Sequence, residues 1–136
     1  MRITVDTNVI FAAILRDSTA RRILQSDNIR FNMPENGVAE IRKYENEIMQ
    51  KAGYTKEEFE SILGLVLENV ELVPVETFKA RKVEADEIMG NIDIMDSVFV
   101  ATCLATNSEG IWSFDRHFER QSTIRVFKVD ELLEMV

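Results

Sequence analysis

Hydrophobic residues follow two patterns along this chain: short runs rich in β-branched residues, and longer segments with helical spacing. Short runs that contain β-branched residues predict strands at residues 3–5, 70–73, 110–113 and 124–127, and alternating apolar positions predict a fifth at 30–33. Strands that alternate with helices favour a mainly parallel sheet covered on both faces. The pattern therefore predicts a three-layer α/β/α fold, and no linker or repeat divides the chain, so we expect one domain spanning residues 1–136.

The predicted helices lie between these strands and show capping and breaking residues at their ends. They cover residues 9–15, 18–24, 35–52, 55–67, 76–88, 93–105 and 130–135. Thr7 and Asn8 are suitable N-caps for the first helix, and Gly53 is placed to end the long one. Thr55 and Glu58 form a capping box. The helix from Asp93 is apolar almost all round, so we expect it to be buried.

Composition restricts the possible classes of protein. The net charge of −8 argues against a general nucleic-acid coat or a membrane-surface protein. The single Cys103 cannot form an internal disulfide, which suits a reducing cytoplasm. No apolar run has the length of a membrane span, and Asp6 interrupts any signal-peptide core. We therefore expect a cytoplasmic protein without a membrane partner.

Acidic residues stand at positions that a buried core normally excludes. Asp6 and Asp115 each lie just past a predicted strand, at the edge of a parallel sheet where ligands bind. Asp93 and Asp96 open the apolar helix and, three residues apart, share broadly one face. Clustered carboxylates repel one another and are costly to desolvate, and a hard divalent cation such as Mg²⁺ or Mn²⁺ removes both problems.

Simpler interpretations of these acids remain open. Asp6 also fits a turn or cap residue, and Asp93 fits a charge that complements the helix dipole. An aspartate-nucleophile phosphatase needs a second acid where this chain has Asn8, and a dinucleotide-binding module needs a Gly-rich first turn, which is missing. Both of these enzyme and binding classes therefore fit poorly.

Three segments resemble motifs of the PIN-domain family, which includes the toxin ribonucleases of toxin–antitoxin pairs. Residues 5–8 (Val-Asp-Thr-Asn) are similar to its opening, residues 93–101 to its third acidic motif, and residues 112–118 to its last. Glu40 matches the family's acidic position early in the helix after the second strand, although a solvated helix face would also explain it. The resemblance extends from residue 3 to about 128.

This resemblance implies a strand order of 3-2-1-4-5 and metal-dependent cleavage of RNA or, less often, of DNA. It implies that the catalytic metal ligands, for Mg²⁺ or Mn²⁺, are Asp6, Glu40, Asp96 and Asp115. Asn8 and Ser113 would orient those ligands, and Asp93 would contribute through water. The alternative function is a PIN-like protein that binds RNA or a partner protein without turnover.

Partners are expected from the same resemblance and from surface chemistry. An RNA substrate, a homodimer and a cognate antitoxin are the expected partners, with Tyr44, Met49 and Tyr54 as candidate contacts of the dimer. Because phosphate binding needs local cations, the candidates near the acids are Arg42, Lys43, Arg81, Lys82, Arg116 and Arg120. His117 is assigned a surface or phosphate-side role rather than a catalytic one.

Overall fold

A computed structural model describes residues 1–16, 18–90, 92–93 and 96–136. Its five parallel strands form one sheet in the order β3-β2-β1-β4-β5, which confirms the predicted fold class and strand order. The strands are β1 (Arg2–Val5), β2 (Arg30–Pro34), β3 (Val70–Val73), β4 (Ile111–Trp112) and β5 (Val126–Phe127).

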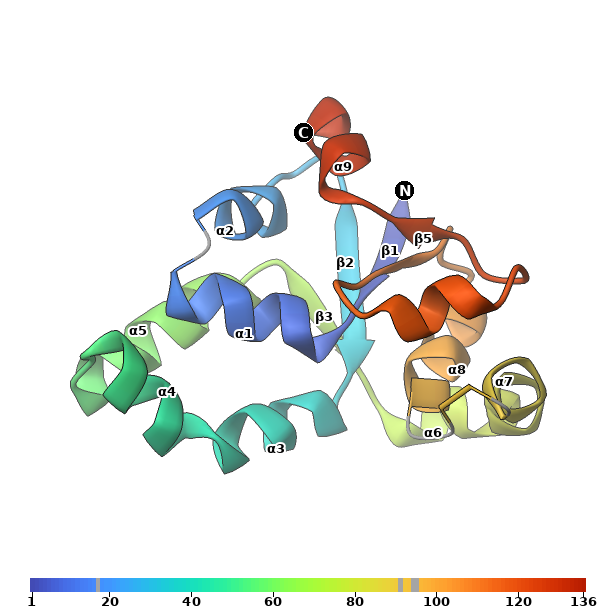
Figure 1. The fold of residues 1–136 in the computed structure, drawn as a ribbon, viewed down its shortest axis with the longest axis horizontal. Helices are drawn as coiled ribbons and strands as arrows, with labels where there is room; N and C mark the ends of the chain where they lie inside the picture. The colour runs from blue at the N-terminus through green and yellow to red at the C-terminus, as the bar shows by residue number, and fades with distance from the viewer. Residues whose placement is uncertain (17, 91, 94–95) are drawn as a thin grey trace.

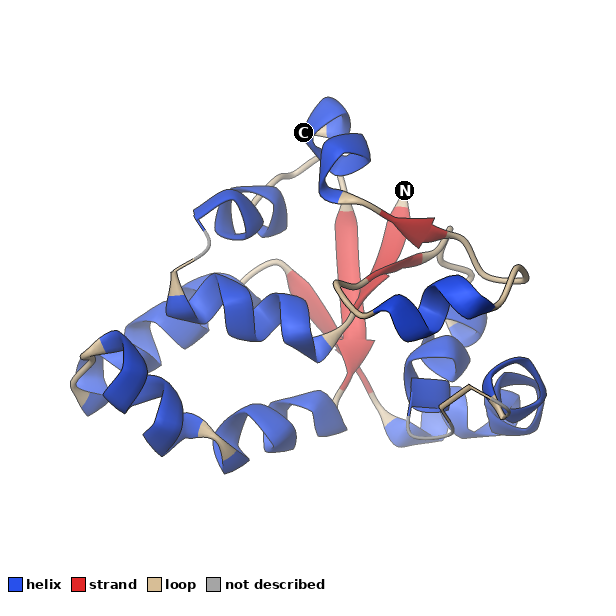
Figure 2. Ribbon diagram, in the orientation of Figure 1, coloured by secondary structure: helices blue, strands red, loops and turns tan. Residues whose placement is uncertain are grey.

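Helices cover both faces of this sheet, and two hydrophobic clusters form the core between the layers (Figures 1 and 2). The first cluster joins β1 and β2 to α1 (Thr7–Leu15), α2 (Ser18–Leu24), α5 (Lys56–Leu67) and α9 (Val129–Met135). The second lies under α6 (Val75–Phe78), α7 (Lys82–Met89) and α8 (Ser97–Ala105). Among the described residues, no helix has the length and apolar character needed to span a membrane.

Two long predicted helices are interrupted. The segment predicted at 35–52 forms α3 (Asn36–Lys43) and α4 (Glu45–Ala52), which meet at Tyr44, where ψ is 11°. The segment predicted at 76–88 contains a 3₁₀ turn, η1 (Lys79–Arg81), between α6 and α7. Because an amphipathic stripe continues across a local break, periodicity alone does not reveal either interruption.

Some of the predicted helix termini are confirmed and others are not. Gly53 ends α4 with a φ of 72°, and the Thr55 capping box opens α5, as predicted. By contrast, α1 begins at Thr7 with Asp6 in the N-cap position, so the predicted caps at Thr7 and Asn8 are wrong. A short 3₁₀ helix, η3 (Arg116–Arg120), follows β4 and was not predicted.

The segment predicted to be helical from Asp93 is α-helical from Ser97, where α8 begins, and Asp96 directly before it is 3₁₀-helical. Asp93 precedes the helix, and its carbonyl accepts a hydrogen bond of 3.2 Å from the backbone N–H of Asp96. The two carboxylates point to one place, since Oδ2 of each lies 3.2 Å from Nδ1 of His117. Asn91, part of a predicted turn, and residues 94–95 lie outside the described residues.

Candidate active site

The end of β1 and the end of β4 meet at the middle of the sheet. The register pairs Val5 with Trp112, and the backbone N–H of Asp6 donates to the Trp112 carbonyl at 2.9 Å. The residue after each strand therefore faces the same edge, where α1 and η3 begin. This topology brings Asp6 next to Ser113.

A pocket of about 410 Å³ opens at this edge. Its lining residues come from β1–α1, α3, α8 and the segment after β4, and they are Asp6, Thr7, Asn8, Phe11, Glu40, Lys43, Tyr44, Asp96, Phe99 and Asp115. The pocket thus brings together the four acids that the resemblance had singled out, although they are far apart in the sequence. We call it the acidic pocket.

Asp6 forms the buried end of the acidic pocket and is only 6% exposed. Burial raises the pKa of its carboxyl to about 6, and the nearby carboxylates of Asp96 and Asp115 act in the same direction. A hydrogen bond of 2.7 Å from the Ser113 hydroxyl to Oδ2 opposes the rise. Asp6 is therefore a charge that lacks an adequate counter-charge in the protein itself.

Ser113 links the two strand ends. Besides donating to Asp6, its hydroxyl oxygen accepts the backbone N–H of Asp115 at 2.9 Å. The Asn8 amide lies 3.5 Å from the same hydroxyl and accepts the backbone N–H of Phe114 at 3.4 Å. Ser113 thus contacts a pocket carboxylate directly, and Asn8 contacts it through Ser113.

His117 lies among the carboxylates. Its Nδ1 is 3.2 Å from Oδ2 of both Asp93 and Asp96 and 3.3 Å from Oδ2 of Asp115. The hydrogen bond to Asp96 and the surrounding negative charge raise the pKa of the imidazole. The turn of η3 brings it there, since its backbone N–H donates to Asp115 Oδ1 at 2.9 Å.

The sequence analysis missed this position of His117. The available signal was its separation of two residues from Asp115, which suits an Asp side chain that caps the following N–H. Its contacts with Asp93 and Asp96 cross the fold and leave no local pattern. The structure therefore places the imidazole nitrogen of His117 among the carboxylates of Asp93, Asp96 and Asp115.

Asp96 and Asp93 differ in their surroundings. Asp96 lines the acidic pocket, and burial raises the pKa of its carboxyl, opposed by the His117 hydrogen bond and reinforced by Asp93. Asp93 is not among the residues lining that pocket, but it reaches its edge through His117. Asp96 therefore lines the acidic pocket and also contacts His117.

The donors fit a hard divalent cation. Asp93, Asp96 and His117 each offer one ligand atom, all within 4.8 Å of one another. The acidic pocket adds the carboxylate oxygens of Asp6, Glu40 and Asp115. Oxygen-rich donor sets of this kind select Mg²⁺ or Mn²⁺ over softer metals.

Most of the candidate cations are used elsewhere. Lys43 lines the acidic pocket. Arg42 pairs with Glu45 and Glu60, Arg81 with Glu84, and Lys82 with Asp86. Arg116 lines a neighbouring pocket, and Arg120 lines neither. Of these six candidate phosphate-binding residues, Lys43 is thus the one that lines the acidic pocket.

Comparison with known proteins identifies the family. A family profile described as "PIN domain" matches residues 4–129, which include all the lining residues of the acidic pocket. No curated protein matches the chain. PIN domains are typically metal-dependent nucleases, in agreement with the acidic pocket. The profile covers nearly the whole sequence, and the chain belongs to the PIN-domain family.

Proposed function

We propose that this protein is a metal-dependent endoribonuclease that hydrolyses RNA phosphodiester bonds. The observation that carries the proposal is the convergence of Asp6, Glu40, Asp96 and Asp115, from four separate segments, on one pocket. An acidic pocket repels a phosphate diester unless cations reside there, so the same geometry favours a metal-loaded enzyme.

Each residue has a defined task in this proposal. Asp6, Glu40, Asp96 and Asp115 hold Mg²⁺ or Mn²⁺, and Ser113 fixes the Asp6 carboxylate through its 2.7 Å hydrogen bond. A bound cation supplies an activated water and neutralises charge on the phosphate. Asn8 braces Ser113, and Lys43 offers its ammonium group to the RNA backbone.

An RNA cleavage assay tests the function. Purified protein should cut an end-labelled single-stranded RNA at internal positions with Mn²⁺ and leave it intact with a chelator. Asp115→Asn should be inactive, whereas Asp27→Asn, an exposed acid outside the acidic pocket, should retain activity. RNA binding without any cleavage at any metal concentration would instead support the alternative, a PIN-like binding protein.

Metal should also stabilise the fold. Because a ligand that binds only the folded state raises its stability, the thermal midpoint should increase with Mn²⁺ concentration. Asp115→Asn should show a smaller rise, and Asp27→Asn the full one. Scanning calorimetry in a chelator and in millimolar Mn²⁺ makes the comparison, and a wild-type midpoint indifferent to Mn²⁺ would contradict metal binding.

We further propose that the nuclease is the toxin of a toxin–antitoxin pair, on the strength of the motif resemblance alone. Expression in a bacterial host should slow growth, and co-expression of a small DNA-binding protein encoded beside it should restore growth. Asp96→Asn should be harmless in the same host. Equal toxicity of wild type and Asp96→Asn would separate growth inhibition from the acidic pocket.

We also propose a homodimer that uses the surface around α3 and α4. Of the predicted contacts, Tyr44 is exposed, whereas Met49 and Tyr54 pack against the core. The Tyr54 hydroxyl donates to the Ile14 carbonyl at 2.8 Å, which ties it to α1. Light scattering should give twice the mass of one chain for the wild-type protein. For Tyr44→Glu it should give the mass of a single chain. A wild-type monomer at high protein concentration would overturn the dimer.

A further inference from the structure

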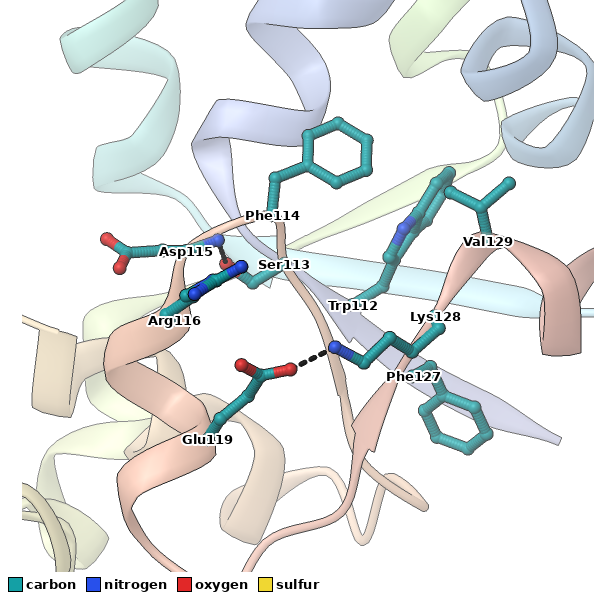
Figure 3. Close-up of a pocket in the computed structure, with 9 residues that line it drawn as sticks. All are labelled: Trp112, Ser113, Phe114, Asp115, Arg116, Glu119, Phe127, Lys128 and Val129. Atoms are coloured by element: carbon teal, nitrogen blue, oxygen red, sulfur yellow. Dashed lines mark hydrogen bonds and ion pairs between the residues drawn. The ribbon is translucent and has the colours of Figure 1, made fainter.

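A second pocket lies beside the acidic one, at the carboxyl ends of β4 and β5 (Figure 3). Its volume is about 220 Å³, and it shares Asp115 with the acidic pocket. It is lined by Trp112, Ser113, Phe114, Asp115, Arg116, Glu119, Phe127, Lys128 and Val129. We call it the β4–β5 pocket. Anything bound in it lies next to the proposed cleavage site.

Aromatic rings form one side of this pocket. Phe114 is 44% exposed although it is large and apolar, and it stands edge to face with Trp112, with 6.1 Å between ring centroids. Trp112 is fully buried. Its indole N–H finds no acceptor among the described residues, and an unsatisfied buried donor is costly. The pocket thus offers one exposed aromatic ring, that of Phe114, to a ligand.

Two basic residues also line the pocket. Figure 3 shows Arg116 near Glu119, and Lys128 paired to the same Glu119. Arg116 forms no ion pair with any carboxylate in the described part of the chain. An unpaired guanidinium close to an aromatic surface is suited to bind a phosphate while a base stacks on the ring.

We propose that the β4–β5 pocket binds one nucleotide of the substrate strand, adjacent to the phosphate that is cleaved. The base lies against the exposed ring of Phe114, and its phosphate binds Arg116. A volume of about 220 Å³ has room for one base but not for a base pair, so the sugar and phosphate of the nucleotide lie at the opening. This inference rests on the proposed nuclease function for its biological meaning, but binding itself requires neither metal nor cleavage.

Trp112 is the only tryptophan, so its fluorescence reports on the pocket directly. Nucleoside monophosphates carrying each of the four RNA bases are titrated into the full chain in the presence of a chelator, with inorganic phosphate as a separate arm. We expect a saturable change in emission with at least one nucleotide. Phosphate alone should bind about tenfold more weakly, because it lacks the stacking base.

Two variants localise the signal. Arg116→Ala should weaken nucleotide binding about tenfold, whereas Arg120→Ala, which removes the same charge from the other end of η3, should leave it unchanged. Phe114→Leu keeps an apolar side chain but removes the ring, so it should weaken nucleotide binding and not phosphate binding. Circular dichroism of each variant checks that the fold is retained.

The outcomes separate this inference from the proposed function. No saturable emission change up to millimolar nucleotide, or equal losses in Arg116→Ala and Arg120→Ala, would overturn the nucleotide pocket. Equal affinity for phosphate and for every nucleotide would overturn the role of the base. Nucleotide binding with these variant effects supports the pocket even if RNA is never cut, a result that would contradict only the nuclease proposal.

Discussion

Asp96→Asn is expected to lower the rate of Mn²⁺-dependent RNA cleavage by more than about 100-fold, whereas Asp93→Asn should lower it by about 10-fold. The difference follows from position. Asp96 lines the acidic pocket, and its partly buried carboxyl has a raised pKa, so its charge needs a cation. Asp93 reaches the group through His117, at 3.2 Å from Nδ1. Loss of a metal ligand prevents the metal from binding, whereas loss of an orienting contact only lowers the affinity of the site for the metal.

Both variants should be measured on one RNA over a range of Mn²⁺ concentrations. Excess Mn²⁺ should restore much of the activity of Asp93→Asn, because the four carboxylates that line the acidic pocket remain in that variant. It should not restore Asp96→Asn, and Asp27→Asn serves as the control for loss of an exposed charge. An inactive Asp93→Asn beside an active Asp96→Asn would reverse the assignment of these two residues.

The fold could be predicted because its determinants are local. Runs with β-branched residues specify β1 and β3, alternation of apolar and polar residues specifies β2, and the order of strands and helices then restricts the topology to a parallel sheet. The position of Asp6 follows from the same logic, since a residue just past a parallel strand must lie at the carboxyl edge. The strand order itself came from the motif resemblance rather than from periodicity.

The details of the site could not be predicted, because they depend on contacts between distant segments. Asp93 and Asp96 were expected side by side, and their carboxylates do converge, but the side chain on which they converge, His117, was not expected there. His117 reaches Asp96, 21 residues earlier in the chain, through the turn of η3. Similarly, Arg42 was a reasonable phosphate ligand until the structure placed Glu60 against it. Hydrophobic patterning contains no information about such polar pairings.

Asp6→Asn is expected to stabilise the metal-free protein at neutral pH while it abolishes cleavage. The pKa of Asp6 rises from 3.8 to about 6 on folding because the carboxyl is buried. Folding therefore favours the protonated acid, and the stability that Asp6 contributes is fully present below its unfolded pKa and lost as pH rises through about 6. Replacing it with a neutral amide should raise the free energy of unfolding by ~2–3 kcal/mol at pH 8.

Urea unfolding with a chelator, at several pH values between 4 and 8, measures this effect. The advantage of Asp6→Asn over wild type should be largest at pH 8 and should shrink to a small fraction of that value near pH 4, where Asp6 is protonated in the folded state and about half protonated in the unfolded state. Asp27→Asn, at an exposed position, should show no such trend. At pH 8, Mn²⁺ should reduce the difference in unfolding free energy between the variant and wild type. The ion stabilises wild type, whereas the variant has lost one of the ligands that bind it. If Asp6→Asn were less stable than wild type at pH 8 without metal, the contacts of the Asp6 carboxylate would stabilise the fold by more than the burial of its charge costs.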